Sequence, residues 1–168
     1  MQLSREGGVV ETCNNHTIER GNFDTDPEDE VKVDGTVYNN GDTITLDGKS
    51  YTVKIVTSSP FTGTTANDFI VGTSDADTIS GGEGDDFIVG LGSNDRLSGD
   101  GIEGTSGNDT ITGGNDILCG NDGDDDLFGD GILGYAGNNT ITGGDDTLEG
   151  GDGDDELSGD AIGGYVGN

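Results

Sequence analysis

The feature that most constrains this chain is a nine-residue repeat that runs from Gly63 to about Asp160. Residues 81–89 and 150–158 match the pattern G-G-x-G-x-D-x-U-x at every specified position, where U is a large aliphatic residue. Residues 120–128 differ only in having Asn121 in place of the second glycine. A short repeat of this kind indicates a stack of similar small units, each in contact with its neighbours, rather than a domain around one large core.

Each repeat has a turn half and a strand half. Glycines in the turn half permit positive φ angles, so the backbone can bend there without a Cβ clash. The sixth position carries an acidic candidate ligand, and this set is Asp68, Asp77, Asp86, Asp95, Asp109, Asp116, Asp125, Asp146 and Asp155. Two positions later comes one aliphatic residue, and this set is Ile70, Ile79, Ile88, Leu97, Ile111, Leu118, Leu127, Ile141, Leu148 and Leu157. Because neighbouring side chains of a strand point to opposite faces, we expect only this aliphatic residue to point inward.

One aliphatic residue in nine makes a thin core. Apolar burial stabilises by ~25 cal/mol per Å², whereas ordering the backbone costs about 1–2 kcal/mol per residue. A Gly/Asp-rich segment with few aromatic residues is normally disordered, and we expect that state without metal. Calcium is a suitable stabilising ion, because it accepts about six to eight oxygen ligands in flexible geometry, from carboxylates and backbone carbonyls alike.

The repeat resembles the RTX (repeats-in-toxin, haemolysin-type) calcium-binding family. The resemblance implies an all-β fold, a parallel β-roll (β-helix solenoid) in which two nonapeptides make one turn and calcium ions lie in the loops at both edges. It also implies that each aspartate of the set above bridges to the loop two repeats further on. About four to eight Ca²⁺ ions are then expected. Backbone carbonyls are expected to complete the ligand shells near Gly82, Gly84, Gly123, Gly151 and Gly153.

The charge of the chain agrees with a metal-dependent module. The 168 residues include 35 Asp or Glu and only 6 Lys or Arg, for a formal net charge of −29. Without cations such a chain repels itself and is expected to be extended. Nucleic acids and anionic membrane surfaces both attract basic residues, so neither is expected as a partner. No run approaches the roughly 18 apolar residues of a membrane span, so membrane insertion is not expected either.

The residues before the repeat have a different character. We divide the chain into an N-terminal β cap with an irregular leader (residues 1–62) and the calcium-binding roll (residues 63–168). Residues 1–30 predict irregular structure or short strands, and residues 31–57 predict a small antiparallel β-meander of about four strands. The meander is expected to cap the unpaired edge of the first turn of the solenoid. The hairpin signals are three Asx-Gly pairs between β-branched runs, at positions 34–35, 40–41 and 47–48.

The two cysteines, Cys13 and Cys119, leave three arrangements open: one intrachain disulfide, one intermolecular disulfide, or two free thiols. Cys119 directly follows the inward-pointing Leu118, so it is expected to point outward. The only histidine, His16, lies among polar neighbours and is expected to be a surface side chain.

A longer period appears from Gly99 onward. Residues 99–128 align with residues 129–158 without a gap, and each thirty-residue unit contains three altered or intact nonapeptides. Because three is an odd number, stacking two nonapeptides per turn would place the insertions alternately at the two edges. Asn139 stands where an aspartate is expected, which predicts a weak or missing ion at that position.

The sequence gives no indication of catalysis. A single histidine excludes most catalytic triads and His-rich zinc sites, and no G-x-S-x-G motif is present. In the acidic pairs Asp85-Asp86 and Asp154-Asp155 we expect one calcium ligand and one solvated neighbour. We therefore expect no enzyme.

The predicted function is structural. We expect a secreted or cell-surface calcium-binding protein of bacterial type, unfolded in the low-calcium cytosol and folded after export. The resemblance implies type I secretion. Two further possibilities follow: end-to-end stacking of copies into a fibre or surface layer, or a role as an accessory module or fragment of a larger secreted enzyme, adhesin or toxin.

Overall fold

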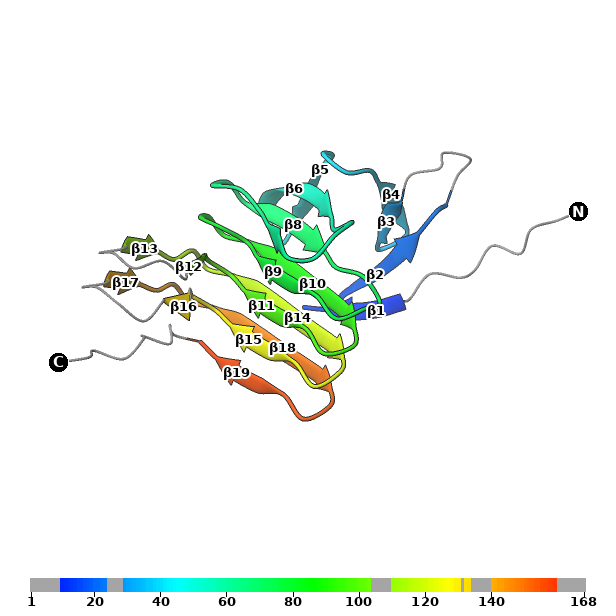
Figure 1. Ribbon diagram of the computed structural model, residues 1–168. Helices are drawn as coiled ribbons and strands as arrows, with labels where there is room; N and C mark the ends of the chain where they lie inside the picture. Colours follow the sequence, from blue (N-terminus) through cyan, green and yellow to red (C-terminus); the bar gives the residue numbers. More distant parts are fainter. Residues whose placement is uncertain (1–9, 24–28, 104–109, 131, 134–139, 160–168) are drawn as a thin grey trace, which may run out of the picture.

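The computed structural model describes residues 10–23, 29–103, 110–130, 132–133 and 140–159 (Figure 1). Every regular element in this part of the chain is a β-strand, so the all-β prediction is confirmed. None of these residues forms a helix long and apolar enough to cross a membrane.

The N-terminal sheet is antiparallel, in the order β1-β2-β3-β4. Its strands are β1 (Val10–Cys13), β2 (His16–Gly21), β3 (Glu30–Val33) and β4 (Thr36–Tyr38). Two tight turns, Asn14-Asn15 and Asp34-Gly35, connect β1 to β2 and β3 to β4, and all four turn residues have positive φ. Asn, Asp and Gly tolerate this conformation better than other residues, so the local sequence favours both hairpins.

The expected four-stranded meander over residues 31–57 is wrong, because its strands belong to two different sheets. β3 and β4 lie in the N-terminal sheet, whereas the hairpin of β5 (Thr43–Leu46) and β6 (Lys49–Ile55) joins a six-stranded sheet. There β6 runs parallel to β8 (Asp68–Val71). The repeat region offers an unpaired strand edge, and pairing with β6 satisfies the backbone groups along it.

The repeat strands lie in two sheets between which the chain alternates. The six-stranded sheet has the order β18-β14-β10-β8-β6-β5, and the five-stranded sheet has the order β19-β15-β11-β9-β7. All neighbouring repeat strands are parallel. The remaining strands of these two sheets are β7 (Phe61–Thr62), β9 (Thr78–Ser80), β10 (Phe87–Gly92), β11 (Arg96–Ser98), β14 (Ile117–Asp122), β15 (Asp126–Phe128), β18 (Thr147–Asp152) and β19 (Glu156–Ser158). Residues 43–62, which the sequence places in the cap, therefore contribute β5, β6 and β7 to the same sheets as the repeats.

The aliphatic position of the repeat forms the inner core, as predicted. Six of these side chains have no exposed surface and pack together with Val56, namely Ile70, Ile79, Ile88, Leu97, Leu118 and Leu127. Leu148 is partly buried against this cluster, and Leu157 in the last strand is 45% exposed. The burial of the aliphatic position thus decreases toward the C-terminal end of the stack. Ile111 and Ile141 lie where the structure does not describe side chains.

A second core lies on the opposite face of the six-stranded sheet, under the N-terminal sheet. Phe69, Phe87 and Val89 in the repeats pack in one buried cluster with Ile18 and Val31 of the N-terminal strands. The aliphatic residue is thus the one that points into the inner core, as expected, but in the early repeats the flanking residues are buried as well, on the other face of the sheet. Their flanking positions are apolar because a second sheet covers them, which increases the buried apolar area.

The expected alternation of the insertions between the two edges is wrong. Strands one turn apart are offset by 18 residues in the first repeats (Ile70 opposite Ile88) and by 30 residues later (Ile88 opposite Leu118). The whole thirty-residue unit therefore makes one turn. The extra residues form an excursion at one edge, where β12 (Ile102–Glu103) pairs with β16 (Ile132–Leu133) and β13 (Thr110–Thr112) with β17 (Thr140–Thr142). This arrangement keeps equivalent aspartates and aliphatic residues aligned between turns.

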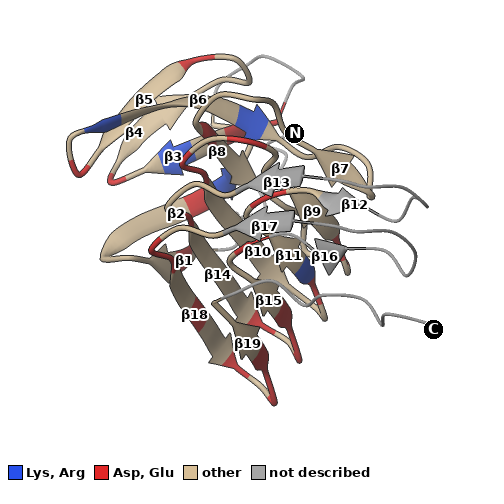
Figure 2. Ribbon diagram, turned by 90° about the vertical axis from the view of Figure 1, so that its left-hand side faces the viewer, with Lys and Arg blue, Asp and Glu red and all other residues tan. Residues whose placement is uncertain are grey.

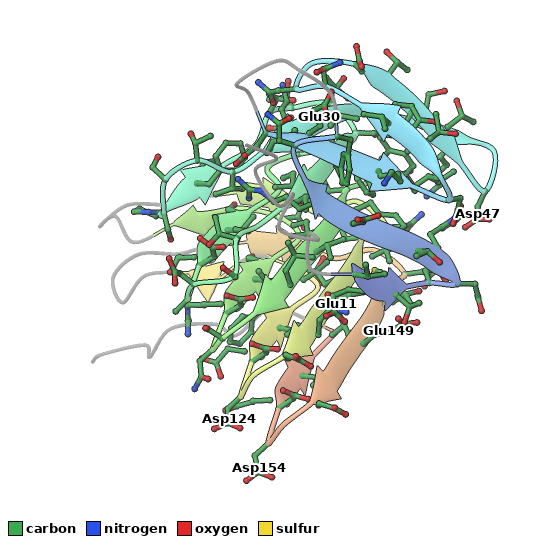
Figure 3. All side chains as sticks on the ribbon, turned by 90° about the vertical axis from the view of Figure 1, so that its right-hand side faces the viewer. Glu11, Glu30, Asp47, Asp124, Glu149 and Asp154 are labelled. Atoms are coloured by element: carbon green, nitrogen blue, oxygen red, sulfur yellow. A yellow bond between two sulfur atoms is a disulfide. The ribbon has the colours of Figure 1, made fainter. Side chains whose placement is uncertain are left out.

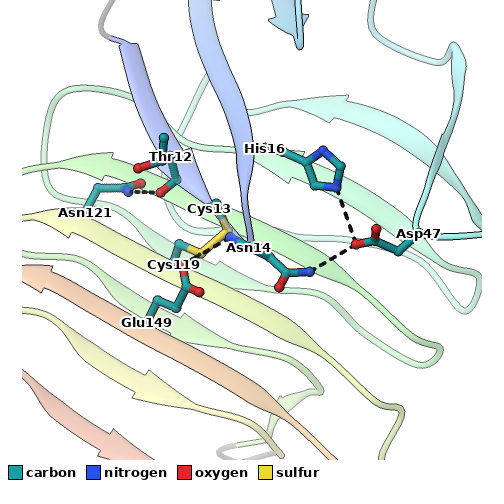
Figure 4. The surroundings of a disulfide bond; sticks show 8 residues. All are labelled: Thr12, Cys13, Asn14, His16, Asp47, Cys119, Asn121 and Glu149. Carbon is teal, nitrogen blue, oxygen red and sulfur yellow. Dashed lines mark hydrogen bonds and ion pairs between the residues drawn. A yellow bond between two sulfur atoms is a disulfide. The ribbon is translucent and has the colours of Figure 1, made fainter.

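The cysteines form an intrachain disulfide, which decides among the three arrangements left open by the sequence. Cys13 in β1 and Cys119 in β14 are bonded across 106 residues of chain (Figure 4). Cys119 points away from the inner core, as predicted, but it is buried beneath β1. Two hydrogen bonds flank the bridge: the Asn14 backbone N donates to Glu149, and the Asn121 amide donates to the Thr12 carbonyl. The disulfide therefore fastens the N-terminal hairpin onto the repeat strands.

His16 is partly buried rather than a free surface side chain. Its Nδ1 lies 2.7 Å from Asp34 Oδ2, and its Nε2 lies 3.4 Å from Asp47 Oδ2. Burial alone would lower the pKa of His16, but the hydrogen bonds to the two carboxylates outweigh it and raise the pKa. The side chain thus links the turns of two hairpins.

Candidate metal centre

The sixth-position aspartates form two ladders, each at the start of one stack of strands. The first ladder is Asp68, Asp86, Asp116 and Asp146, and the second ladder is Asp77, Asp95, Asp125 and Asp155. In both, the backbone N of each aspartate donates to Oδ1 of its counterpart one turn later, over 2.6–3.0 Å. The structure therefore brings together eight of the nine predicted ligands. Asp109 lies outside the described residues, as does Asn139.

The ladders are buried at the covered end of the stack. Asp68, Asp86 and Asp125 have no exposed surface, and Asp77, Asp95 and Asp116 are at most 4% exposed. Burying a carboxylate costs free energy unless hydrogen bonds or a cation compensate it. After the first member of each ladder, Oδ1 of every carboxylate accepts a ladder hydrogen bond, so the chemistry of the site depends on Oδ2.

Four of these second oxygens have no donor. No donor in the described part of the chain reaches the buried Oδ2 atoms of Asp86, Asp95, Asp116 and Asp125. Buried polar atoms are normally hydrogen-bonded, so an unpaired oxygen that recurs at equivalent positions indicates a ligand.

Glycines make room around these oxygens. A Cβ at Gly81 would overlap Asp86 Oδ2 and the carbonyl oxygen of Gly99, which lies one turn further on. We call this arrangement a corner: a glycine, the aspartate of its own loop and a glycine carbonyl of the next turn. Three other corners have the same construction around an oxygen without a donor, with the members Gly90, Asp95 and Gly120; Gly99, Asp116 and Gly129; and Gly120, Asp125 and Gly150. The same neighbours recur at Gly129 with Asp146 and Gly159 and, in the first turn, at Gly63 with Asp68 and Gly81 and at Gly72 with Asp77 and Gly90. Each corner therefore gathers carboxylate and carbonyl oxygens from two successive turns.

The glycines that were expected near ligand carbonyls lie in the same loops. All five have positive φ, between 110° and 148°. A Cβ on Gly82 would overlap the carbonyl oxygen of Thr64, and one on Gly153 would overlap that of Gly123. Gly84, Gly123 and Gly151 likewise lie against the backbone of the loop one turn earlier. The positive φ angles agree with the sequence-based expectation for the turn half, and the absence of side chains also allows the loops to stack at close range.

The pKa values of the corner aspartates respond to this environment. Burial raises the pKa of Asp86 to about 8, the hydrogen bond from the Asp68 backbone opposes this, and the neighbouring carboxylates raise it further. Burial is also the main cause that raises the pKa of Asp95 to about 8 and the pKa of Asp116 to about 9. The pKa of Asp125 is raised for the same reason. The metal-free corners therefore favour protonated carboxyls, and a cation is what favours the ionised form.

Two buried aspartates were not among the predicted ligands. Asp100 and Asp130 are each 1% exposed and occupy equivalent positions at the start of the excursion. Burial, followed by the charges of Asp130 and Asp146, raises the pKa of Asp100 to about 7. The recurrence of Gly-Asp-Gly at residues 99–101 and 129–131 was the signal that could have identified them.

The fifth-position residues are more than solvated neighbours. Asp124 and Asp154 project from the turns at the ends of β14 and β18 (Figure 3), where acidic residues gather (Figure 2). The Asp154 backbone N donates to Asp124 Oδ1, and the Asp124 backbone N donates to Asn94 Oδ1. At the other edge the same relation joins Asn67, Asp85, Asn115 and Asp145. A second, more exposed ladder thus runs beside each buried one.

The donor set fits a hard cation. Every ligand candidate in a corner is a carboxylate or carbonyl oxygen, which calcium prefers. The described residues contain one group of three metal-binding side chains whose ligand atoms lie within 4.8 Å of one another, Cys13, Cys119 and Glu149, and its two thiols form the disulfide. Each corner combines one carboxylate with carbonyls and therefore does not depend on three acidic side chains.

Comparison with known proteins agrees with this geometry. Neither the curated proteins nor the solved structures gave a match to this chain. The family model of the RTX calcium-binding nonapeptide repeat matches residues 62–97, 98–127 and 133–161, which together make up more than half of the sequence. These repeats bind calcium and are typical of secreted proteins. The chain therefore belongs to the RTX calcium-binding nonapeptide-repeat family.

Proposed function

We propose that this protein is a calcium-dependent parallel β-roll that folds when it meets calcium outside the cell. The observation that carries the proposal is the set of four buried corners in which Asp86, Asp95, Asp116 and Asp125 each leave one oxygen without a donor. A bound Ca²⁺ would supply the positive charge that these oxygens lack. Corner aspartates and glycine carbonyls of successive turns would hold it.

The charge of the chain supports folding on calcium binding. At −29, the chain opposes its own compaction in water. Each bound Ca²⁺ contributes two positive charges at the place where carboxylates of successive turns come together. About four to eight ions would therefore offset a substantial part of the repulsion.

The disulfide supports an extracellular location. Disulfides persist in oxidising environments and are rare in the reducing cytosol. Cys13 and Cys119 bridge two segments that are far apart in sequence, and both are buried. We infer that the protein functions where both calcium and oxidised thiols are present.

The proposal is tested by circular dichroism during a calcium titration, with magnesium as the ionic control. We expect strand signal to increase cooperatively with calcium and much less with magnesium, which retains its water ligands more strongly. A variant with Asp86→Asn, Asp95→Asn, Asp116→Asn and Asp125→Asn removes the four corner charges. This variant should need a far higher calcium concentration than the wild-type chain to reach the same strand signal. Equal strand content in calcium and in excess chelator would refute calcium-dependent folding.

We further propose a non-catalytic, structural role in which copies associate end to end. β18 and β19 each pair on only one side within the described residues, whereas β5 and β6 cover the opposite end of the larger sheet. The exposed Leu157 and partly buried Leu148 leave apolar surface at this open end. A second copy would cover it.

Light scattering coupled to size-exclusion chromatography tests the association. We expect the mass to increase with protein concentration in calcium and to be that of one chain in chelator. The Leu157→Lys variant, which places a charge on the open end, should remain monomeric. A wild-type monomer at high protein and calcium concentration would contradict the assembly role but not calcium binding.

A further inference from the structure

The first complete turn of the repeat, residues 63–80, differs from the later turns in how its aspartates are satisfied. The Thr64 backbone N and hydroxyl donate to Asp68 Oδ2, over 2.7 and 2.8 Å. Thr73 makes the same two contacts with Asp77 Oδ2, over 2.6 and 3.0 Å. The second oxygen of each first-turn aspartate therefore already has two donors from its own loop.

Two basic side chains also lie at this turn. The Arg20 guanidinium donates to the carbonyl oxygens of Gly72 and Val56 and pairs with Asp29. The Lys54 ammonium lies 3.9 Å from Asp68 Oδ1, a buried oxygen that no hydrogen-bond donor of the described residues reaches, so the lysine supplies charge rather than a hydrogen bond there. Gly72 begins the loop of Asp77, so each edge of the first turn has one protein cation beside its oxygen ligands. The chain has only six Lys and Arg residues in all, and two of them are placed here.

The corners of the later turns lack the hydroxyl donor, and the basic side chains described there, Lys49 and Arg96, pair with Asp85 and Asp126 rather than with a corner aspartate. Gly82, Leu91 and Asn121 occupy the position of Thr64 and Thr73 in their repeats, and none of these residues has a hydroxyl group. In the same loops, Oδ2 of Asp86, Asp95 and Asp125 is buried without a donor. Whether the aspartate Oδ2 has a donor therefore depends on whether the second residue of the repeat is a threonine.

We propose that the first turn does not bind calcium, because Thr64, Thr73, Arg20 and Lys54 supply in its place the donors and positive charge that the ion supplies elsewhere. This inference rests on the calcium-dependent folding proposed above. The calcium sites then begin at Asp86 in the first ladder and at Asp95 in the second. Residues 63–80, with the N-terminal sheet and β5–β6 packed against them (Figure 1), form a metal-independent unit that provides the first strand edge for the calcium-bound turns.

Calcium stoichiometry by native mass spectrometry tests the assignment of the ions. The Asp68→Asn/Asp77→Asn variant should bind as many ions as wild type. The matched Asp86→Asn/Asp95→Asn variant should lose roughly two, because each aspartate contributes to a separate site. Loss of ions from the first variant would overturn the inference, as would an unchanged ion count in the second.

Hydrogen exchange of the intact, disulfide-bonded protein tests the metal-independent unit. In excess chelator we expect amides of β6, β8 and β9 to remain slow, while those of β14, β15 and β18 become fast. Simultaneous loss of protection in all six strands would overturn this inference and leave calcium-dependent folding intact. Unchanged protection in all six would instead refute the proposed function.

The role of the hydroxyls is tested by comparing Thr64→Ser/Thr73→Ser with Thr64→Val/Thr73→Val. Serine retains the donor and valine removes it with little change in volume. In chelator, we expect β8 and β9 to lose protection only in the valine variant. Equal protection in the two variants would contradict a role for the hydroxyls, and the stoichiometry of the wild-type chain tests the ion assignment even if the valine variant does not fold.

Discussion

The corner aspartates show how one residue type is used in two ways within one repeat. Oδ2 of Asp68 and of Asp77 receives two donors from the threonine of the same loop, whereas Oδ2 of Asp86 and of Asp95 receives none. In the second case burial raises the pKa, so these carboxyls are protonated in the metal-free fold near neutral pH. At the proposed calcium sites, ionisation of these carboxyls and calcium binding are therefore linked.

This linkage predicts opposite pH dependences with and without calcium. The folded pKa values of Asp86 and Asp95, about 8, lie above the ordinary 3.8, so the metal-free folded state holds more protons than the unfolded state between these values. Its stability must therefore fall as the pH rises through this range. With calcium, stability should rise with pH, because the ion binds carboxylates. Circular dichroism at several pH values in chelator measures the first dependence, as strand content that should increase when the pH is lowered, and urea unfolding at the same pH values in calcium measures the second. A change in the same direction in both solutions would contradict the prediction.

A second prediction at this scale concerns a corner glycine. In Gly120→Ala the new Cβ would overlap Asp125 Oδ2 and lie 2.8 Å from the Gly150 carbonyl oxygen. We expect the variant to lower the free energy of unfolding in calcium by about 1–3 kcal/mol, the usual cost of overpacking. It should also weaken calcium binding. Gly159→Ala is the matched control, because no atom lies within 4 Å of its Cβ position; equal effects of the two substitutions would argue against the corner.

At the scale of elements, the hairpin of β1 and β2 is held on the repeat by one covalent bond and a buried apolar surface. Ile18 in β2 and Cys13 in β1 lie in one cluster with Phe87 and Val89 of β10. The disulfide to β14 closes 106 residues of chain, which restricts the unfolded state much more than a local bridge would. The hairpin thus links the start of the chain to the thirty-residue units.

We therefore expect Cys13→Ser/Cys119→Ser to lower the free energy of unfolding by about 2–4 kcal/mol at saturating calcium. The cause is greater freedom of the unfolded chain, so the number of bound calcium ions should not change. Denaturant unfolding, with ion counting by mass spectrometry, measures both quantities. Loss of ions along with stability would indicate that the bridge also shapes the corners.

At the scale of the whole molecule, the net charge of −29 destabilises the compact parallel stack by electrostatic repulsion unless cations are bound. The two buried ladders concentrate carboxylates along two lines, and the fifth-position ladders add further acidic groups beside them. Calcium ions at the proposed sites between turns would reduce the repulsion where it is strongest. Monovalent salt screens exposed charges but cannot bridge oxygens of successive turns.

Small-angle X-ray scattering should detect compaction of the chain by calcium as a decrease in the radius of gyration. A compact chain of this length has a radius of gyration of about 15 Å and an unfolded one about 43 Å. In calcium we expect a value near the lower figure for the monomer. In chelator we expect an intermediate value, because the N-terminal unit remains folded. High sodium chloride should not restore the compact value, and full compaction by sodium alone would contradict the need for a bridging ion.

The sequence by itself determined the features that depend on local periodicity. Alternation along a strand predicts that Ile70 and Ile88 point to the same interior, and the nine-residue spacing aligns the aspartates of the first turns. Glycines at positive φ, such as Gly82, were likewise predictable, because few other residues adopt that conformation. Hence the all-β class, the inner core and eight of the nine candidate ligands followed from the repeat.

Only the tertiary structure decided what depends on contacts between distant segments. The pairing of Cys13 with Cys119, the parallel docking of β6 on β8 and the excursion of each thirty-residue unit at one edge have no local signal. Nor does the sequence reveal that Arg20 lies against Gly72, because 52 residues separate them. Local spacing fixes which way a side chain points along its own strand, whereas the free energy of packing one sheet on another determines which groups it meets.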